Sequence, residues 1–474
     1  MADEFRGAEL RDKRLTGRLV WLGETMERSP GAGFPQMTDN DSELGAIYRF
    51  LNNDKVSPEG VLKPHIRETL ARAKAAGTCL VVHDTTEFDY PGGVRPRKGL
   101  GRTGSSKSGF LSHMSLVVSA DGGRVPLGVL AVDNFARTGE KAPKKTCAER
   151  RSDDTRESLR WDRQFVHCED LRAKQFEAVH LCDREADIYR FLASAEQRGS
   201  RYVVRAAQDR RVSEEESEEI SSLFKITSTM EAQLTRVIEL SERADGLTPS
   251  QRKRYPKRKA RLATVAMAGK RLTMHRPRGE SKELPKSIEL GVVRVWELDV
   301  PEGEPPVEWL LLTREPLDTA AQVETVVDWY RARWVIEEFF KVLKTGCSIE
   351  KRQLETYEAL VNALAVFLPI GWRMLLLRAL SRVAPDEPAR LVINEVQETL
   401  LRDKTRRTDT NPMTVLEALY AIASLGGHLK RNGAPGWLTI GRGFQELLLL
   451  EVGFRMAVRI GAAGGPPPGP HKKI

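Results

Sequence analysis

The run Cys79-Leu80-Val81-Val82-His83-Asp84-Thr85-Thr86 marks the point where the chain changes from helical to strand-like patterning. Its apolar part is typical of a buried β-strand, and the strand is expected to run out at Asp84. Two further strands are predicted over residues 110–120 and 124–134, joined by the turn signal Asp121-Gly122-Gly123. This stretch therefore predicts a sheet that carries an acidic residue where its first strand ends.

A second acid follows a second strand of the same kind. Ala178-Val179-His180-Leu181-Cys182 is an apolar run that ends at Asp183, with a helix predicted before it, a helix to about residue 198 after it, and a strand over residues 201–205. The order of strand, hairpin, helix, strand, helix and strand describes a mixed α/β core. Ligands gather outside the carboxyl ends of strands, so Asp84 and Asp183 are candidate site residues.

Four polar residues recur at helical spacing in the segment from Asp328 to Lys344. Tyr330, Arg333, Glu337 and Lys344 would share one face of a helix. One carboxylate, two cations and a phenol suit a metal ion on the carboxylate, with phosphate oxygens on the other three. An ordinary solvated helix face would show the same spacing, so the pattern gains its meaning from the two acids upstream.

Asp84, Asp183 and Glu337 together suggest a metal centre. Three converging carboxylates can hold two Mg²⁺ or Mn²⁺ ions roughly 3.5–4 Å apart, and hard oxygen ligands favour these ions over zinc. His83 and His180 could suggest zinc, but no second paired motif at zinc spacing accompanies them, which favours a role for both histidines in the core.

Charge and cysteine content point to a cytosolic protein with an anionic partner. The 474 residues carry a formal net charge of +9, which is common among proteins that meet a polyanion. Five scattered cysteines without CxxC spacing fit a reduced compartment. The most apolar segment, residues 359–380, is interrupted by Pro369 and charged or polar residues, so we expect a buried helix pair and no membrane partner.

The densest cationic run spans residues 252–261. A contact with a phosphate backbone and a solvated surface loop are both open readings of it. The residues predicted to touch phosphate are Arg252, Lys253, Arg254, Lys257, Arg258 and Lys259.

Taken in order, these motifs resemble the DDE transposases of the insertion-sequence-four group, typified by the transposon-five transposase. The resemblance rests on Asp84-Thr85-Thr86, on Cys182-Asp183-Arg184-Glu185-Ala186-Asp187-Ile188, and on the Tyr-x2-Arg-x3-Glu-x6-Lys signature that begins at Tyr330. Tyr202-Val203-Val204-Arg205 and Trp309-Leu310-Leu311-Leu312-Thr313 fit it as well. It is strongest over residues 80–205 and 307–347.

The resemblance implies an RNase H-like mixed-sheet core in which Asp84, Asp183 and Glu337 bind two Mg²⁺ or Mn²⁺ ions per active site. It also implies that Tyr330, Arg333 and Lys344 hold phosphate at the transposon end.

Two further DNA contacts follow from the resemblance. Trp309 matches a tryptophan that stacks against a flipped-out base, and such stacking is worth about 1–3 kcal/mol per base. Arg205 matches a DNA-contacting arginine. The family has a lysine nearby where this chain has Ala206-Ala207-Gln208, so that phosphate contact is either missing or supplied by Arg210 or Arg211.

The pattern and the resemblance together predict six segments: 1–75, a helical domain that binds DNA ends, with amphipathic stretches at 8–26, 41–51 and 58–76; 76–205, the first part of the catalytic core; 206–314, a β-rich insertion with the basic loop; 315–355, the second part of the core; 356–460, a helical dimerisation domain; and 461–474, a disordered tail.

The predicted function is cut-and-paste DNA transposition. Its partners would be double-stranded DNA, as terminal inverted repeats and as target, and a second copy of the chain in a synaptic complex. The protein would be cytoplasmic, bacterial and nucleoid-associated. Two alternatives stay open at this point: a catalytically silent DNA-end-binding regulator, and an RNase H-like structure-specific nuclease.

Overall fold

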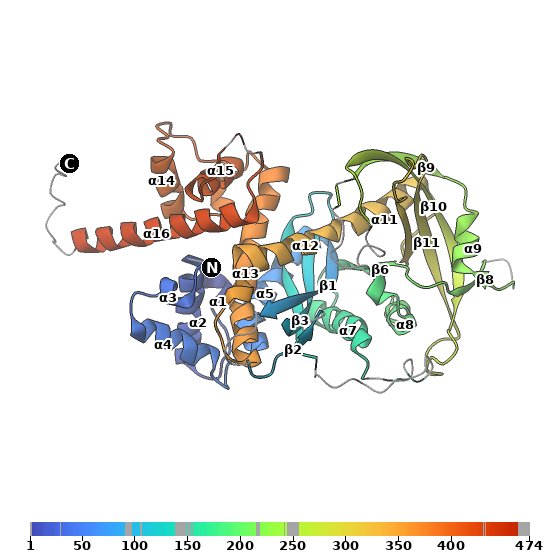
Figure 1. The fold of residues 1–474 in the computed structure, drawn as a ribbon, viewed down its shortest axis with the longest axis horizontal. Coiled ribbons are helices and arrows are strands. Elements are labelled where there is room, and N and C mark those ends of the chain that lie inside the picture. The colour runs from blue at the N-terminus through green and yellow to red at the C-terminus, as the bar shows by residue number, and fades with distance from the viewer. Residues whose placement is uncertain are drawn as a thin grey trace.

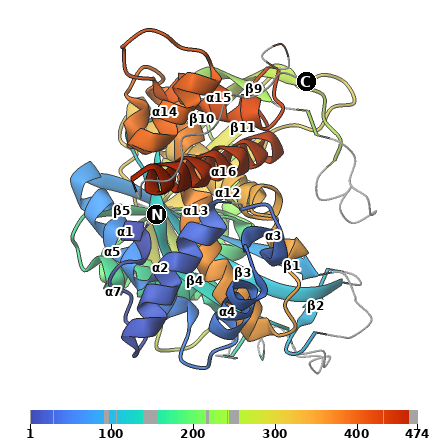
Figure 2. The same cartoon turned by 90° about the vertical axis from the view of Figure 1, so that its left-hand side faces the viewer.

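In the computed structural model the chain is a mixed α/β protein, with helical regions from both ends of the chain on one side of a long sheet (Figure 1). Figure 2 shows the C-terminal helix α16 (Trp437–Ala462) crossing in front of the other elements. The structure describes residues 2–28, 30–90, 97–104, 107–137, 149, 153, 155–214, 219–240, 242–243, 256–429, 431 and 433–462.

The N-terminal region is helical, as its amphipathic pattern predicts. Its helices are α1 (Ala2–Phe5), α2 (Lys13–Arg28), α3 (Phe34–Met37), α4 (Asp41–Leu51) and α5 (Pro58–Ala76). The side chains of Asn40 and Ser57 accept hydrogen bonds from backbone N–H groups in the first turns of α4 and α5. These N-caps satisfy donors that the start of a helix leaves free, and they explain why both helices begin where the sequence predicts.

A mixed sheet forms the centre of the molecule. Its strands are β1 (Thr78–Tyr90), β2 (Gly101–Thr103), β3 (Lys107–Ser119), β4 (Pro126–Phe135), β5 (Glu177–Cys182) and β6 (Arg201–Arg205). β3 is antiparallel to β1 and pairs in turn with β2 and β4, whereas β5 and β6 extend the sheet in parallel from the other side of β1. The connecting elements are η1 (Glu157–Leu159), α7 (Arg160–Arg172), η2 (Arg184–Ala186) and α8 (Tyr189–Arg198). The predicted mixed α/β class is confirmed.

Strand β1 does not end at Asp84, and this part of the prediction is wrong. It continues to Tyr90, and β3 pairs with it along this length, with Asp84 opposite Met114. The parallel neighbour stops earlier, because β5 pairs with β1 only as far as Val82. The change from apolar to polar residues near Asp84 therefore marks where the pairing with β5 ends, and not where β1 ends.

The strands after β6 continue the same sheet. They are β7 (Arg211–Glu214), β8 (Ser221–Ser222), β9 (Leu234–Leu240), β10 (Arg261–His275), β11 (Ser287–Glu297) and β12 (Glu308–Thr313), with helix α9 (Leu223–Ser228) after β8. β12 pairs antiparallel with β6, so the described strands form one twelve-stranded sheet. The strands expected between residues 206 and 314 are present, and the division into a core and an insertion remains a prediction.

Alternate residues of β1 point to opposite faces of the sheet. Leu80 and Val82 belong to the large core that also contains helix α13 (Tyr357–Val383). Cys79 and Val81 belong to a smaller core with Cys168 of α7. This alternation continues along β1 and decides on which side of the sheet each site residue lies.

The segment from Asp328 to Lys344 is not the single regular helix that its spacing predicts. α11 (Ala320–Ala332) ends before Arg333, and α12 (Trp334–Lys341) leads into a π-helical turn, η3 (Val342–Gly346). The Cys347 N–H donates to the Val342 carbonyl, five residues back, at 2.8 Å. Lys344 therefore lies in a π-helical turn and not in the regular α-helix from which its face was predicted.

The C-terminal region contains η4 (Ile349–Lys351), α13, η5 (Ala389–Leu391), α14 (Glu395–Lys404), α15 (Val415–Leu425) and α16. α13 is one continuous helix with Pro369 inside it, although a helix pair was expected. Among the described helices it alone is long and apolar enough to cross a membrane, but 89% of its most apolar window is buried in the protein. α13 is therefore a core helix.

A buried arginine joins the N-terminal helices to the segment after η3. Arg352 is 2% exposed, and its guanidinium donates hydrogen bonds to the backbone carbonyls of Pro30, Ala32 and Cys347. It also lies over the ring of Phe34, 5.4 Å from the centroid. Burial lowers the pKa of Arg352 to about 10. The side chain thus satisfies three carbonyls from two separate parts of the chain.

Replacing Arg352 by alanine should lower the free energy of unfolding by about 2–5 kcal/mol, because each buried carbonyl left without a donor costs about 1–3 kcal/mol. Urea titration followed by tryptophan fluorescence measures the change. Lys351→Ala, at the exposed neighbouring position, is the control and should shift stability by less than about 0.5 kcal/mol. Equal stability of the two variants would contradict this role for Arg352.

Candidate active site

Asp84 occupies a buried position in the middle of β1. It follows Val82 by two residues, so its carboxylate lies on the face of the large core, and its exposed fraction is 9%. Oδ1 accepts the backbone N–H of Thr85 at 2.8 Å, and Oδ2 accepts a hydrogen bond from Nη1 of Arg333 at 2.5 Å. A rigid strand therefore holds the acid, and a cation from the facing helical segment lies against it.

Arg333 bridges two of the three predicted metal ligands. It lies between α11 and α12, and its Nη2 is 3.6 Å from Oε1 of Glu337 while its Nη1 contacts Asp84. Glu337 is four residues later, one helical turn along, which places both side chains on the same side of α12. Arg333 was predicted to hold phosphate, and in this structure it faces carboxylates.

Asp183 is the residue directly after β5. Its side chain accepts the backbone N–H of Glu185 at 2.7 Å and so caps η2. Because β5 is the parallel neighbour of β1, the carboxyl end of β5 lies beside Asp84. The predicted end-of-strand position is confirmed for this acid.

The electrostatics show that the three acids share one site. Burial is the largest cause that raises the pKa of Asp84, and the charges of Asp183 and Glu337 add to it, so that the pKa reaches about 7 even though Arg333 opposes the rise. Burial lowers the pKa of Arg333, but the carboxylates outweigh it and leave the pKa above its ordinary value. Asp84 and Glu337 thus contact one guanidinium and the charge of Asp183 also acts on it, and such coupled charges are typical of functional sites.

The donor set fits a hard divalent cation, because carboxylate oxygens are the ligands such ions prefer. Among the residues that the structure describes, no three His, Cys, Asp or Glu side chains already lie at metal-binding distances. The positive charge at the acids comes from Arg333 instead. The charges of the three acids therefore influence one another, but the carboxylates do not already lie at the distances of a metal coordination shell.

A second group of side chains lies next to Arg333. Burial raises the pKa of Tyr330, and the neighbouring charges of Arg333 and Arg205 oppose that rise. The ring of Trp309 lies 6.0 Å from that of Tyr330, at an angle of 58°. Trp309 and Arg205 come from the paired strands β12 and β6. The structure thus brings together four of the side chains that were predicted to contact DNA.

Lys344, the last residue of the signature that begins at Tyr330, lies beside the part of β1 beyond Asp84. Its Nζ is 4.0 Å from Oε1 of Glu350 and 5.7 Å from the centroid of the Phe88 ring. Phe88 is four residues beyond Asp84, which is about 13 Å along an extended strand. Lys344 therefore extends the row of polar residues toward the end of β1.

The basic loop is described only in part. Arg252, Lys253 and Arg254 lie outside the described residues. Lys257 and Lys259 are exposed, and the backbone of Arg258 pairs with that of Arg243. Their proposed contact with phosphate remains a prediction.

Arg210 does not replace the missing lysine near Arg205, and this expectation is wrong. Arg210 is buried, with its Nη2 2.6 Å from Oδ1 of Asp187. Asp187 also accepts the backbone N–H of Ala207 at 2.7 Å, so this pair shapes the loop after β6. Arg211 is exposed and remains the other alternative.

His83 and His180 are core residues. Nδ1 of His83 hydrogen bonds with Ser115 at 2.9 Å, its Nε2 with Nδ1 of His180 at 2.8 Å, and Nε2 of His180 with Glu169 at 2.8 Å. Burial lowers the pKa of both histidines. They form a buried polar chain on the α7 side of the sheet, as the core interpretation predicts.

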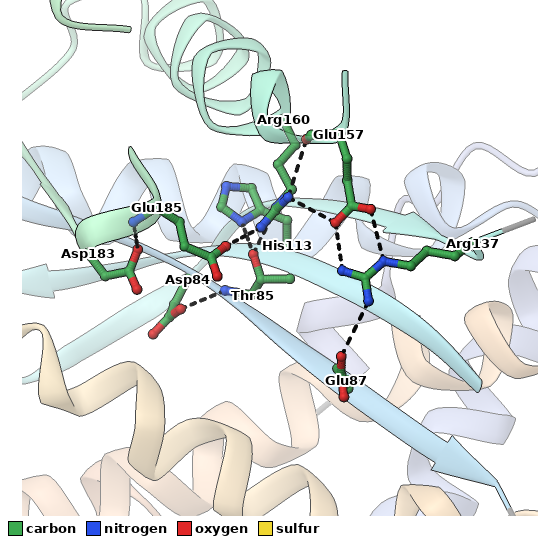
Figure 3. Close-up of polar contacts among 9 residues, drawn as sticks. All are labelled: Asp84, Thr85, Glu87, His113, Arg137, Glu157, Arg160, Asp183 and Glu185. Carbon is green, nitrogen blue, oxygen red and sulfur yellow. Dashed lines mark hydrogen bonds and ion pairs between the residues drawn. The ribbon is translucent and has the colours of Figure 1, made fainter. Parts of the chain in front are cut away.

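Sequence reasoning missed a buried arginine on that same side. Arg160, the first residue of α7, is 6% exposed, donates from Nε to Oγ1 of Thr85 at 3.1 Å, and forms an ion pair with Glu185 (Figure 3). Thr85 and Glu185 follow Asp84 and Asp183 by one and two residues. Glu185 belongs to a motif that the sequence singled out, but nothing distinguishes Arg160 from the other arginines near it.

Two family models match the chain. Residues 1–56 match the family described as Transposase DNA-binding, and residues 163–368 match the one described as Transposase DDE domain. The second match contains Asp183 and Glu337, while Asp84 lies before it. Together the two segments cover more than half of the chain.

The raised pKa of Asp84 predicts how stability depends on pH. Its folded value of about 7 exceeds the ordinary 3.8, so the folded protein binds this proton more tightly than the unfolded chain does. The resulting stabilisation is complete below about pH 4 and is lost as the pH rises through 7. Relative to Asp84→Asn, which does not titrate, the wild type should lose on the order of 1–4 kcal/mol of unfolding free energy between pH 5 and pH 8.

Urea titrations of both proteins at these two pH values measure this difference. If the stabilities of the two proteins changed in parallel with pH, Asp84 would have an ordinary pKa.

Proposed function

Because this chain is a DDE transposase, a metal-dependent enzyme of DNA phosphoryl transfer, we propose that it moves its element by cut and paste. Water attacks phosphorus at each transposon end and breaks the P–O3′ bond, which frees a 3′-hydroxyl. That hydroxyl attacks the opposite strand, forms a hairpin and releases the flanking DNA. A second water opens the hairpin, and the 3′-hydroxyl then attacks target DNA. Each step is an in-line displacement at phosphorus, so one site can serve all of them.

The observation that carries the proposal is the meeting of Asp84, Arg333 and Glu337 between β1 and α12, with Asp183 beside them. We propose that the three acids hold two Mg²⁺ or Mn²⁺ ions. When bound, such ions activate the attacking oxygen and stabilise the leaving one. Arg333 can exchange its carboxylate partners for a phosphate, because its fork of N–H donors matches both groups.

The side chains next to Arg333 suit the end of a transposon. Tyr330 and Arg205 can donate to phosphate oxygens, and the half-buried indole of Trp309 offers a face on which a flipped base can stack. Lys344, farther along β1, would contact a phosphate of the next nucleotides. The basic loop with Lys257 and Lys259 would contact the backbone elsewhere.

The sheet topology supports the proposed RNase H-like core. Strand β3 runs antiparallel to its neighbours β4 and β1, and β1, β5 and β6 run in parallel. The signature at Tyr330 supports membership of the insertion-sequence-four group. We propose a cytoplasmic location with the protein on nucleoid DNA, since the DNA-binding match and the charge of +9 both suit that partner.

Helix α16 supports the proposed homodimer. Its end extends beyond the body of the protein (Figure 1). Apolar side chains that are 41–59% exposed lie along it: Leu449, Leu450, Phe454, Met456, Val458 and Ile460. An apolar surface of this kind marks an interaction site, and a second copy of the chain fits because two transposon ends must be joined in one synaptic complex.

The proposal predicts that Glu337→Ala lowers DNA cleavage by at least about 10²-fold, because the site loses one carboxylate that binds the ions. The substrate is duplex DNA with the inverted repeats that flank the source gene, and the assay follows excision and strand joining in Mg²⁺. Glu338→Ala is the control, since Glu338 pairs with Arg382 at 3.5 Å, and it should cleave like the wild type.

Equal cleavage by Glu337→Ala and the wild type would reject the site. End binding without cleavage in Mg²⁺ or Mn²⁺ would favour a silent regulator, and cleavage of junctions without strand joining would favour a nuclease.

The proposed homodimer predicts that Leu450→Glu combined with Val458→Glu weakens self-association at least tenfold, or by about 1.4 kcal/mol. The reason is that both copies of the chain would then have to desolvate charged side chains on α16 when they associate. Sedimentation of the full-length protein with end DNA measures this. Leu262→Glu places a charge at a leucine that is 73% exposed on β10 and should leave association unchanged. Similar sedimentation of the α16 variant and the wild type would rule out this surface.

A further inference from the structure

We propose that Arg160 is a positioning residue that sets the spacing between Asp84 and Asp183 from the opposite face of the sheet. The inference rests on the proposed function, because it takes these two acids as metal ligands. What carries it is one buried guanidinium that contacts the segments on which both acids lie.

The guanidinium of Arg160 joins those segments directly. Its Nε donates to Oγ1 of Thr85, the residue after Asp84 on β1, at 3.1 Å. Its Nη2 forms an ion pair with Glu185, whose backbone N–H donates to the carboxylate of Asp183 at 2.7 Å. Because the group is planar and rigid, the positions of its two partners are coupled.

Backbone hydrogen bonds between β1 and β5 do not reach the two acids, so a link at that point must come from side chains. The parallel ladder between β1 and β5 ends at the pair Val82 and Leu181, before either acid. Beyond that point Asp84 and Asp183 repel each other, as the raised pKa of Asp84 reflects after the larger effect of burial. The bridge that Arg160 makes from Thr85 to Glu185 holds the two segments together against this repulsion.

Arg160 does not share a face with the acids. The alternation along β1 turns Thr85 toward α7, and it turns Asp84 toward α12. Figure 3 shows Arg160 reaching Thr85 and Glu185 from α7, with the Asp84 carboxylate on the other side of β1. Arg160 therefore acts through Thr85 and Glu185 and not by contact with a phosphate at the acids.

Further ion pairs keep the guanidinium in place. Oε1 of Glu157 is 3.2 Å from Nη1 of Arg160 and 2.8 Å from Nη2 of Arg137, and Arg137 lies 3.7 Å from Glu87 on β1. This chain of contacts starts and ends on β1 (Figure 3). Arg160 is at the N-terminus of α7, where the helix dipole disfavours a cation, so the carboxylates must compensate for that position.

The test measures Mn²⁺ binding by the full-length protein, from the electron paramagnetic resonance signal of free Mn²⁺. Arg160→Gln should raise the dissociation constant about tenfold or more, as loss of a residue that orients ligands does. Glu185→Gln should act in the same direction, and the double variant should bind no more weakly than Arg160→Gln, because both changes break one link.

Arg261→Gln is the matched control. The side chain of Arg261 is 11% exposed and also bridges two carboxylates, Glu297 at 2.9 Å and Glu304 at 3.0 Å, but it lies on β10. Its variant should lose a similar amount of thermal stability and bind Mn²⁺ like the wild type. A loss of stability in Arg160→Gln with unchanged Mn²⁺ affinity would show a merely structural role and overturn the inference.

If Arg160→Gln does not fold, as judged by circular dichroism, Thr85→Val decides, because it removes one hydroxyl and keeps the shape of the side chain. Unchanged affinity in Thr85→Val and Glu185→Gln would then reject the inference. Asp84→Asn and Asp183→Asn test the proposed site itself. If they bound Mn²⁺ like the wild type, the acids would not be the ligands, and the inference would fall with the site.

Discussion

The contact between Arg333 and Asp84 is the interaction on which the functional part of this molecule depends. A carboxylate in the middle of a buried strand is costly unless a cation compensates for it. Arg333 provides that charge at 2.5 Å and reaches Glu337 with its other nitrogen, so it sets the position of α12 over β1. Arg333 keeps helical backbone angles between α11 and α12, so Glu337, four residues later, lies on the same side of the helix.

Charge balance explains why the acids are surrounded by arginines on both faces of the sheet. On one face Arg333 lies where a divalent ion would compete with it for the carboxylates, and where a phosphate would compete with the carboxylates for its guanidinium. On the other face Arg160 holds Thr85 and Glu185, which neighbour the acids in the chain. Arg333 contacts two of the proposed metal ligands themselves, Asp84 and Glu337, whereas Arg160 pairs with Glu157 and Glu185, which are not proposed ligands. This difference is why we assign them different roles.

Pairing between β6 and β12 decides where the side chains proposed to contact DNA lie. Arg205 and Trp309 are about a hundred residues apart in the chain, and they become neighbours because Leu311 pairs with Arg205. Trp309 lies two residues before Leu311 and therefore on the same face of the sheet. That face also holds Tyr330, which contacts the indole. A strand within the long segment after β6 thus completes a site whose acids come from β1, β5 and α12.

The sequence by itself determined the class of fold and most of the strands and helices, because hydrophobic periodicity is a local property. It also singled out Asp84, Asp183 and Glu337, whose role as metal ligands remains a prediction. Helices α4 and α5 begin where the amphipathic pattern predicts, and β5 ends directly before Asp183. Only the tertiary structure decided that β1 continues past Asp84, that Lys344 lies on a π turn, that Arg210 is buried on Asp187, and that Arg160 lies behind the acids. The continuation of β1, the burial of Arg210 and the position of Arg160 depend on partners elsewhere in the chain, and the pattern of neighbouring residues carries no record of such partners.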